Sequence, residues 1–185
     1  MKLDWLQIFD EVYKENGVSE KDITTLVEQI GLPLSEDEIH HINVTQRNPY
    51  PINNPLYNYY KPLDPTKWVI PDKPLPSSYL DFLRWSNGGW FRTGEREFDF
   101  FSTLDLRSIQ LGAAFPQYMP NVIPFASDGG GNYYVFDMRE KAIDEEYPIF
   151  IVDTSNLGFE DAKFLAPAFV EACKGLTKAS DVLYN

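Results

Sequence analysis

The chain has 185 residues, 43% hydrophobic and 15% aromatic, which is enough for one domain with an aromatic-rich core. Asp and Glu total 28 against 16 Lys and Arg, and the net charge of -12 disfavours binding to nucleic acid or to an anionic membrane, because both would repel the protein. The single cysteine, Cys173, excludes an internal disulfide, and no apolar run approaches the ~18 residues that span a bilayer. We therefore expect a cytoplasmic protein.

The first 47 residues predict three helices. Apolar residues recur at helical spacing from Trp5 to Tyr13, which indicates an amphipathic helix that ends before Asn16-Gly17. Ser19 can cap a second helix that Gly31 closes. The segment Ser35-Glu36-Asp37-Glu38 has the form of a capping box and predicts the start of a third helix.

The composition changes between Asn48 and Pro74. This stretch holds seven of the 14 prolines, together with four asparagines and four tyrosines. Proline blocks regular helix, yet the segment is too aromatic for an ordinary disordered linker. We expect a long ordered excursion, which is either an aromatic lid over the core or a surface that binds a partner. The candidate partner-binding residues are Tyr50, Tyr57, Tyr59, Tyr60 and Trp68.

The rest of the chain predicts strands interleaved with short helices. A helix opens at Leu75-Pro76, and two strands and a short helix capped by Ser102 or Thr103 follow it. A hairpin, a β-prone run, an edge strand and a final helix come next, over residues 123–137, 147–153, 162–165 and 167–175. Short turns between strands favour an α+β fold with a largely antiparallel or mixed sheet flanked by helices, in a single domain over residues 1–185.

The glycine triplet Gly129-Gly130-Gly131 raises the question of phosphate binding. A P-loop needs a Lys and a Ser or Thr after its glycines, at the start of a helix. Here Asn132-Tyr133-Tyr134 follows and is typical of a strand, so the triplet also fails as a dinucleotide fingerprint. The triplet therefore predicts a hairpin turn.

No catalytic or metal-binding constellation emerges from the other polar residues. His40 and His41 are adjacent, and adjacent side chains on a helix point about 100° apart; with Glu36 they form at most a two-ligand face. Cys173 has the pattern of a buried core residue. Four carboxylates lie in or beside predicted strands and leave a glycosidase-like pair open as an alternative, namely Asp99, Asp128, Asp137 and Asp153. We expect no metal and no cofactor.

Two motifs in a fixed order resemble those of a known superfamily. The segment from Leu75-Pro76 through Tyr79 to Asn87-Gly88-Gly89 is similar to the first signature of the SUKH superfamily. The second resembles its strand–Asp-Gly-Gly-Gly–strand hairpin and comprises Pro124, Asp128, Gly129, Gly130, Gly131 and Asn132. The resemblance covers roughly Leu75 to Gly175, and the segment from Asn48 to Pro74 looks like an insertion.

Members of this superfamily include bacterial immunity proteins, which neutralise polymorphic toxins, and fungal regulators of cell-wall synthesis. The resemblance implies an α+β domain without a catalytic centre that binds another protein. The acidic composition agrees with a basic partner such as a nuclease toxin, since complementary charge speeds association.

Three hypotheses follow. The first is an immunity protein that binds a cognate, basic protein toxin through an acidic and aromatic surface formed by the insertion and the exposed part of the sheet. The second is a regulatory scaffold or carbohydrate binder linked to the cell wall, because aromatic rings can hold sugars. The third is a hydrolase that uses two of the strand carboxylates.

Overall fold

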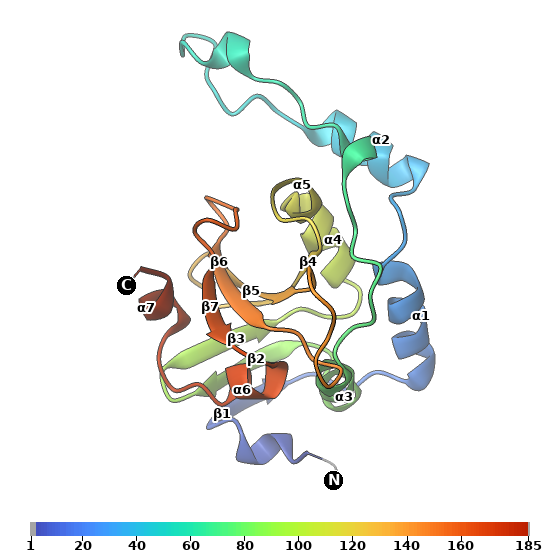
Figure 1. Ribbon diagram of the computed structural model, residues 1–185, viewed down its shortest axis with the longest axis vertical. Helices are drawn as coiled ribbons and strands as arrows, with labels where there is room; N and C mark the ends of the chain where they lie inside the picture. Colours follow the sequence, from blue (N-terminus) through green and yellow to red (C-terminus); the bar gives the residue numbers. More distant parts are fainter. Residues whose placement is uncertain (1–2, 185) are drawn as a thin grey trace.

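The computed structural model describes residues 3–184 and is built on one antiparallel sheet of seven strands (Figure 1). The strands lie side by side in chain order, and each is antiparallel to its neighbours. The predicted α+β class is confirmed, and the sheet is wholly antiparallel. The strands are β1 (Glu11–Lys14), β2 (Gly89–Thr93), β3 (Arg96–Phe100), β4 (Val122–Ser127), β5 (Asn132–Asp137), β6 (Ile149–Asp153) and β7 (Lys163–Ala166).

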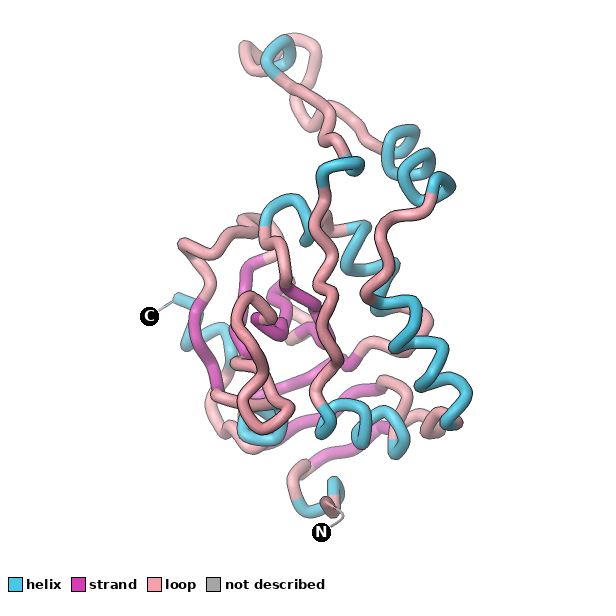
Figure 2. Tube along the Cα trace, turned by 45° about the vertical axis from the view of Figure 1, so that its right-hand side comes forward, coloured by secondary structure: helices cyan, strands magenta, loops and turns pink. Residues whose placement is uncertain are grey.

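Helices surround this sheet, and one part of the chain projects away from it (Figures 1 and 2). The helices are α1 (Glu20–Ile30), α2 (Glu36–Thr45), α3 (Ser77–Trp85), α4 (Leu106–Gly112), α5 (Phe115–Tyr118), α6 (Phe169–Cys173) and α7 (Ala179–Tyr184). Single 3-10 turns occur at Trp5–Gln7, Tyr57–Tyr59 and Pro65–Lys67.

The two faces of the sheet are covered unequally. One face carries the main core, in which α3 and α6 pack their aromatic rings onto those of β2 to β5. Alternate residues of β5 and β6 point to the other face, where Val135 and Val152 join a smaller cluster around Phe115 of α5. The smaller cluster contains no residue of β1, β2 or β3, so this half of the second face is open.

The predicted first helix is wrong. Only Trp5–Gln7 forms a 3-10 turn, and the residues that follow become β1 at the edge of the sheet. Trp5, Ile8 and Phe9 are buried in the main core, but Tyr13 is exposed and stands beside Trp90 of β2 at a ring-centroid distance of 5.5 Å. Pairing with β2, some 80 residues further along the chain, overrides the local helical spacing.

The other elements largely confirm the predictions. Ser19 and Ser35 each cap a helix in a full capping box. The predicted caps of α4 are wrong, because the helix begins after Asp105, whose backbone N–H bonds to the Ser102 carbonyl. Helix α5 falls in a stretch without a clear pattern, and α7 follows Gly175, where the sequence predicts the last helix to end.

Candidate functional site

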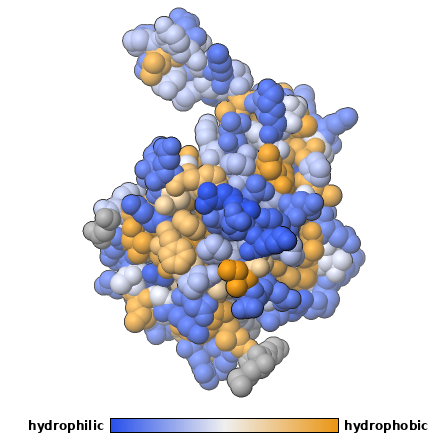
Figure 3. Space-filling view, viewed as in Figure 1, coloured by the Kyte–Doolittle hydropathy of each residue, from blue (hydrophilic) through white to orange (hydrophobic). Residues whose placement is uncertain are grey.

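Residues 47–62, here called the arm, project from the body as a separate lobe (Figure 3). A reciprocal pair closes the base of the arm: the Gln46 side-chain amide donates to the Leu63 carbonyl at 3.0 Å, and its Oε1 accepts from the Leu63 N–H at 2.6 Å. Beyond this clasp, the Asn48 amide donates to the Tyr57 carbonyl at 2.8 Å. Residues 48–62 make their hydrogen bonds within the arm itself. The part of the predicted excursion that forms the arm is therefore folded on itself, and the arm does not form a lid over the sheet (Figure 3).

The five predicted partner-binding residues divide between the arm and its root. Tyr59 is 77% exposed, and Tyr50, Tyr57 and Tyr60 are partly buried. Two aliphatic side chains that the sequence analysis did not select, Ile52 and Leu56, are also exposed on the arm. Trp68 is buried at the root, where its indole N–H donates to Oε1 of Gln117 at 3.0 Å. Trp68 thus fastens the arm to the body and has little surface left for a partner.

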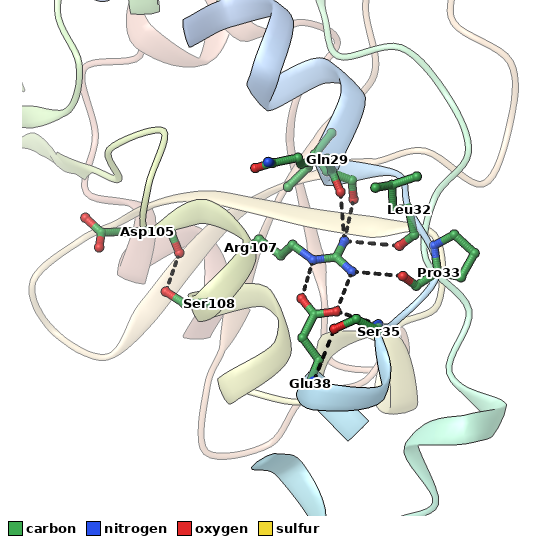
Figure 4. Close-up of polar contacts among 9 residues, drawn as sticks. Gln29, Leu32, Pro33, Ser35, Glu38, Asp105, Arg107 and Ser108 are labelled. Carbon is green, nitrogen blue, oxygen red and sulfur yellow. Dashed lines mark hydrogen bonds and ion pairs between the residues drawn. The ribbon is translucent and has the colours of Figure 1, made fainter. Parts of the chain in front are cut away.

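Arg107 of α4 holds the start of α2 against the body (Figure 4). Its Nε and Nη2 donate to the two carboxylate oxygens of Glu38 at 2.6 and 3.0 Å. The same guanidinium donates to backbone carbonyls that end α1 and lead into α2, those of Gln29, Ile30, Leu32 and Pro33. The arginine thereby joins α4, the end of α1 and the start of α2, and α2 leads directly into the arm.

The contacts in this joint strongly favour the ionised form of the Glu38 carboxylate. Hydrogen bonds from Arg107 lower the pKa of Glu38 from its usual 4.5 to about 2, although partial burial acts in the opposite direction. Glu38 also accepts from the Ser35 N–H at 2.8 Å, which completes the capping box of α2. The carboxylate therefore stays ionised over the whole physiological range, and the joint between the arm and the body does not change with moderate acidification.

The open half of the second sheet face carries the acidic and aromatic character that the sequence predicts for a binding surface. Tyr13, Trp90 and Asp99 lie directly opposite one another across β1, β2 and β3. The neighbouring row contains Glu11, Arg92 and Glu97, in which Glu11 is ion-paired with Arg92. Among the described residues, Glu97 and Asp99 have no ion-pair partner, and both are exposed. We call these six residues the open face.

The arm has a different charge. Residues 39–63 contain no Asp or Glu, and their charged residues are Arg47 and Lys61. The structure therefore separates two surfaces that the sequence predicts as one: an aromatic and aliphatic arm without carboxylates, and an acidic, aromatic open face.

The first of the two sequence motifs builds the core. Leu75 and Tyr79 are buried, and the Tyr79 ring packs 5.2 Å from those of Phe136 and Phe169. Pro76 occupies the N-cap position of α3. Asn87 Oδ1 accepts from the Thr103 N–H at 2.8 Å, while Gly88 and Gly89 have φ of 88° and 109°, values that L side chains rarely adopt.

The second motif shapes the hairpin between β4 and β5. Pro124 lies where the register shifts, and Phe125 bulges toward the main core. The Asp128 carboxylate accepts from the Gly130 N–H at 2.8 Å, from the Asn132 N–H at 3.0 Å and from the Asn132 amide at 2.6 Å. Gly129 and Gly131 have positive φ. Strand β5 follows this turn, and the Asp128 carboxylate accepts hydrogen bonds from backbone N–H groups of the turn.

A comparison with protein families agrees with this structural assignment of the motifs. Residues 72–173, more than half of the chain, match the model of the SMI1/KNR4 family (SUKH-1). The chain belongs to this family. A search of curated proteins finds no match. Membership in SUKH-1 supports an immunity or regulatory role, carried out through protein partners.

The two candidate surfaces differ in how far they lie within the SUKH-1 match. The matched part begins at residue 72, so α1, α2 and the arm precede it. The open face combines β1, which is also outside, with β2 and β3, which are inside. The family match therefore explains the core and the hairpin, and the arm is additional to it.

The candidate residues for catalysis or metal binding mainly make structural contacts in this SUKH-1 protein. Within residues 3–184, no cluster of three or more His, Cys, Asp or Glu side chains could bind a metal ion. Cys173 is fully buried, and burial raises the pKa of its thiol. Asp137 is ion-paired with Arg139 at 2.7 Å, and Asp153 accepts from the Tyr184 hydroxyl at 3.0 Å. No helix in this range is both long and apolar enough to cross a bilayer.

Proposed function

We propose that this SUKH-1 protein is a cytoplasmic immunity protein that neutralises a cognate, basic protein toxin by binding it directly, without catalysis. The observation that carries the proposal is the open face. Its exposed Glu97 and Asp99 carboxylates have no ion-pair partners among the described residues and lie beside the rings of Tyr13 and Trp90. A basic partner supplies the missing counter-charges, and the rings supply apolar contact area.

Charge indicates one class of toxin that would suit this protein, the nucleases. A nuclease toxin holds phosphate groups with a positively charged groove. The net charge of -12 attracts such a protein over a distance and raises the rate of encounter, and the open face offers carboxylates on a rigid sheet for docking. An inhibitor docked in this way covers the toxin's substrate groove.

The arm supports the proposal as a second, apolar contact. The exposed side chains of Ile52, Leu56 and Tyr59 stand on a lobe that the Gln46–Leu63 clasp keeps folded. A preorganised loop loses little conformational entropy on binding, so its contacts contribute efficiently to affinity. The four tyrosines of the arm stay the predicted anchors, with Ile52 and Leu56 added to them.

The absence of catalysis is part of the proposal. Two of the strand carboxylates have structural roles. Asp128 accepts hydrogen bonds that hold its turn together, and Asp137 accepts hydrogen bonds that hold Arg139 in place. A hydrolase needs two carboxylates that face a shared substrate pocket. The parent and an Asp128→Asn/Asp137→Asn variant are both expected to show no turnover on glycoside substrates; turnover in the parent that the variant loses would favour the hydrolase alternative.

The decisive experiment uses the protein encoded beside this gene. Co-expression is expected to protect cells from that protein when it is a toxin, and the two purified proteins should form a stable complex. At low salt, an Asp99→Asn/Glu97→Gln variant should weaken the complex about threefold to tenfold, and an Ile52→Ser/Tyr59→Ala variant should weaken it at least tenfold. Glu160→Gln, an exposed carboxylate in the turn between β6 and β7, is the matched control and should bind like the parent. A toxin-like neighbour that does not bind would contradict the proposal.

One observation favours a second candidate function. The rings of exposed Tyr13 and partly buried Trp90 form an aromatic pair at the surface, and aromatic platforms of this kind stack on sugars. A cell-wall-related regulatory scaffold could bind carbohydrate there. Binding on a glycan array that a Trp90→Ala variant loses would support this function over the immunity role.

A further inference from the structure

A cleft of about 690 Å³ lies where α2 and the root of the arm stand beside α4. Its walls come from four parts of the chain: the end of α1, the inner side of α2, the arm root and α4 with the turn before it. The cleft is separate from the open face, and it touches the arm only at the clasp and at Trp68.

Most of the surface of the cleft wall is apolar, although polar residues also line it. Ile42 of α2, Leu63 and Trp68 of the arm root, and Leu111 of α4 line it, and Leu104 stands at the rim with 87% of its surface exposed. Trp68 and Leu111 are almost fully buried by the protein and so form the firm part of the wall. An isolated leucine this exposed gains free energy when a ligand covers it.

The charges in the lining leave one carboxylate without a partner. Arg107 and Glu38 also line the cleft, but they are bonded to each other, and Arg107 is occupied by four carbonyls as well. Among the described residues, Asp37 has neither a hydrogen bond nor an ion pair to its side chain. Because Glu38 and Arg107 balance each other, Asp37 is the carboxylate of the lining that lacks a counter-charge.

We propose that this cleft binds a lysine or arginine side chain of a protein segment, with the aliphatic stem against the apolar wall and the charged head at Asp37. Both side chains combine a stem of three or four methylenes with a terminal cation, which is the pattern that the lining complements. An anionic ligand would be repelled by the unpaired carboxylate, and a purely apolar ligand would gain no electrostatic attraction from it.

The inference adds a site to the proposed function but is independent of the toxin's identity. A cation bound at Asp37 also contacts the inner side of α2, which Arg107 fixes to the body. The site would therefore bind basic protein segments next to the arm. Of the elements that form it, only α4 lies within the family match.

The test uses small probes and two-dimensional NMR of the isotope-labelled full chain. The Trp68 indole N–H reports on the cleft, and a Trp68→Phe variant assigns its signal. Hexylammonium is expected to shift this signal and the backbone amides of α2 and α4 at lower concentration than 1-hexanol, and hexanoate should bind weakest. No saturable shift in the cleft, or hexanoate binding as well as hexylammonium, would overturn the proposal.

Two variants separate a specific contact from general charge. Asp37→Asn is expected to weaken hexylammonium binding about fivefold, as for the loss of one exposed ion pair, and to bring it close to 1-hexanol. Glu36→Gln removes the same charge from the adjacent residue in the first turn of α2, but Glu36 does not line the cleft. Equal losses in both variants would mean that only the overall charge matters, and the site assignment would fall. These outcomes do not depend on whether the protein binds a toxin.

Discussion

Arg107 is the residue on which the placement of α2 depends. An Arg107→Met variant keeps most of the aliphatic stem but leaves four backbone carbonyls and the Glu38 carboxylate without their donor. We expect a loss of about 2 to 3 kcal/mol in the free energy of unfolding, measured by urea titration. Arg84→Met is the matched control. Its ion pairs with Glu20 and Asp81 are exposed, so the loss should stay below about 1 kcal/mol.

The same pair of residues gives stability a pH dependence. The folded-state pKa of Glu38 is depressed to about 2 from 4.5, so its contribution is fully present above pH 4.5 and is lost as the pH falls toward 2. The difference in stability between the parent and Arg107→Met should therefore be largest near pH 6 and shrink between pH 4.5 and pH 2. A difference that stays constant over this window would show that the carbonyl contacts, and not the carboxylate, carry the effect.

The passage from α3 to β2 depends on glycine for a reason that the backbone shows. Gly89 has a φ of 109°, and a Cβ built there would lie 2.5 Å from the Tyr13 carbonyl oxygen of the paired strand. Gly89→Ala should destabilise the fold by about 2 to 3 kcal/mol or prevent it. Gly112, at the end of α4, has no atom within 4 Å of such a Cβ, and Gly112→Ala should be neutral or stabilise by up to ~1 kcal/mol. Thermal unfolding of both variants checks this contrast. A stable Gly89→Ala variant and a strongly destabilised Gly112→Ala variant would contradict it.

The arm is an element that the body can lose. Its hydrogen bonds beyond the clasp are internal, so replacing residues 48–61 by a short Gly-Ser linker should change the free energy of unfolding by less than ~1 kcal/mol. Extending the deletion to residue 70 removes buried Pro65 and Trp68 and should cost about 3 kcal/mol. Chemical denaturation of the two variants distinguishes an independent lobe from one that supports the core.

How far the sequence predicts these elements depends on whether the cause is local. The predicted helix cap at Ser19 and the predicted capping box at Ser35 depend only on residues at the start of each helix, and both predictions are correct. The hairpin at Asp128 is equally local. The helical spacing of Trp5 to Tyr13 is misleading, because β1 is formed by pairing with β2, and nothing near Tyr13 in the sequence indicates that partner.

The candidate surfaces follow the same rule. The arm is visible in the sequence as a cluster of prolines and tyrosines, but its composition does not distinguish exposed Tyr59 from buried Trp68. The open face could not be predicted, because it depends on the register that sets Tyr13, Trp90 and Asp99 opposite one another. An exposed carboxylate becomes informative only when its neighbours across the strands are known.

At the scale of the whole molecule, charge is distributed unevenly. The whole chain has a net charge of -12, and residues 39–63 carry two cations and no carboxylate, so the rest of the chain holds 28 carboxylates against 14 cations and has a net charge of -14. Long-range attraction of a basic partner therefore comes from the body, and short-range apolar contact comes from the arm. Charge at a rim or on a face acts mainly on the association rate, and desolvated apolar contacts act mainly on dissociation.

This division predicts separable kinetics with the neighbouring toxin as the partner. For the parent, the association rate should fall steeply between 50 and 300 mM salt, because ions screen the body's charge. Asp99→Asn/Glu97→Gln should flatten that dependence and slow association about threefold to tenfold at low salt, with little change in dissociation. Ile52→Ser/Tyr59→Ala should leave the salt dependence intact and speed dissociation at least tenfold. Surface plasmon resonance measures both rates. If the arm variant altered the salt dependence and the face variant did not, the roles of the two surfaces would be the reverse of those assigned here.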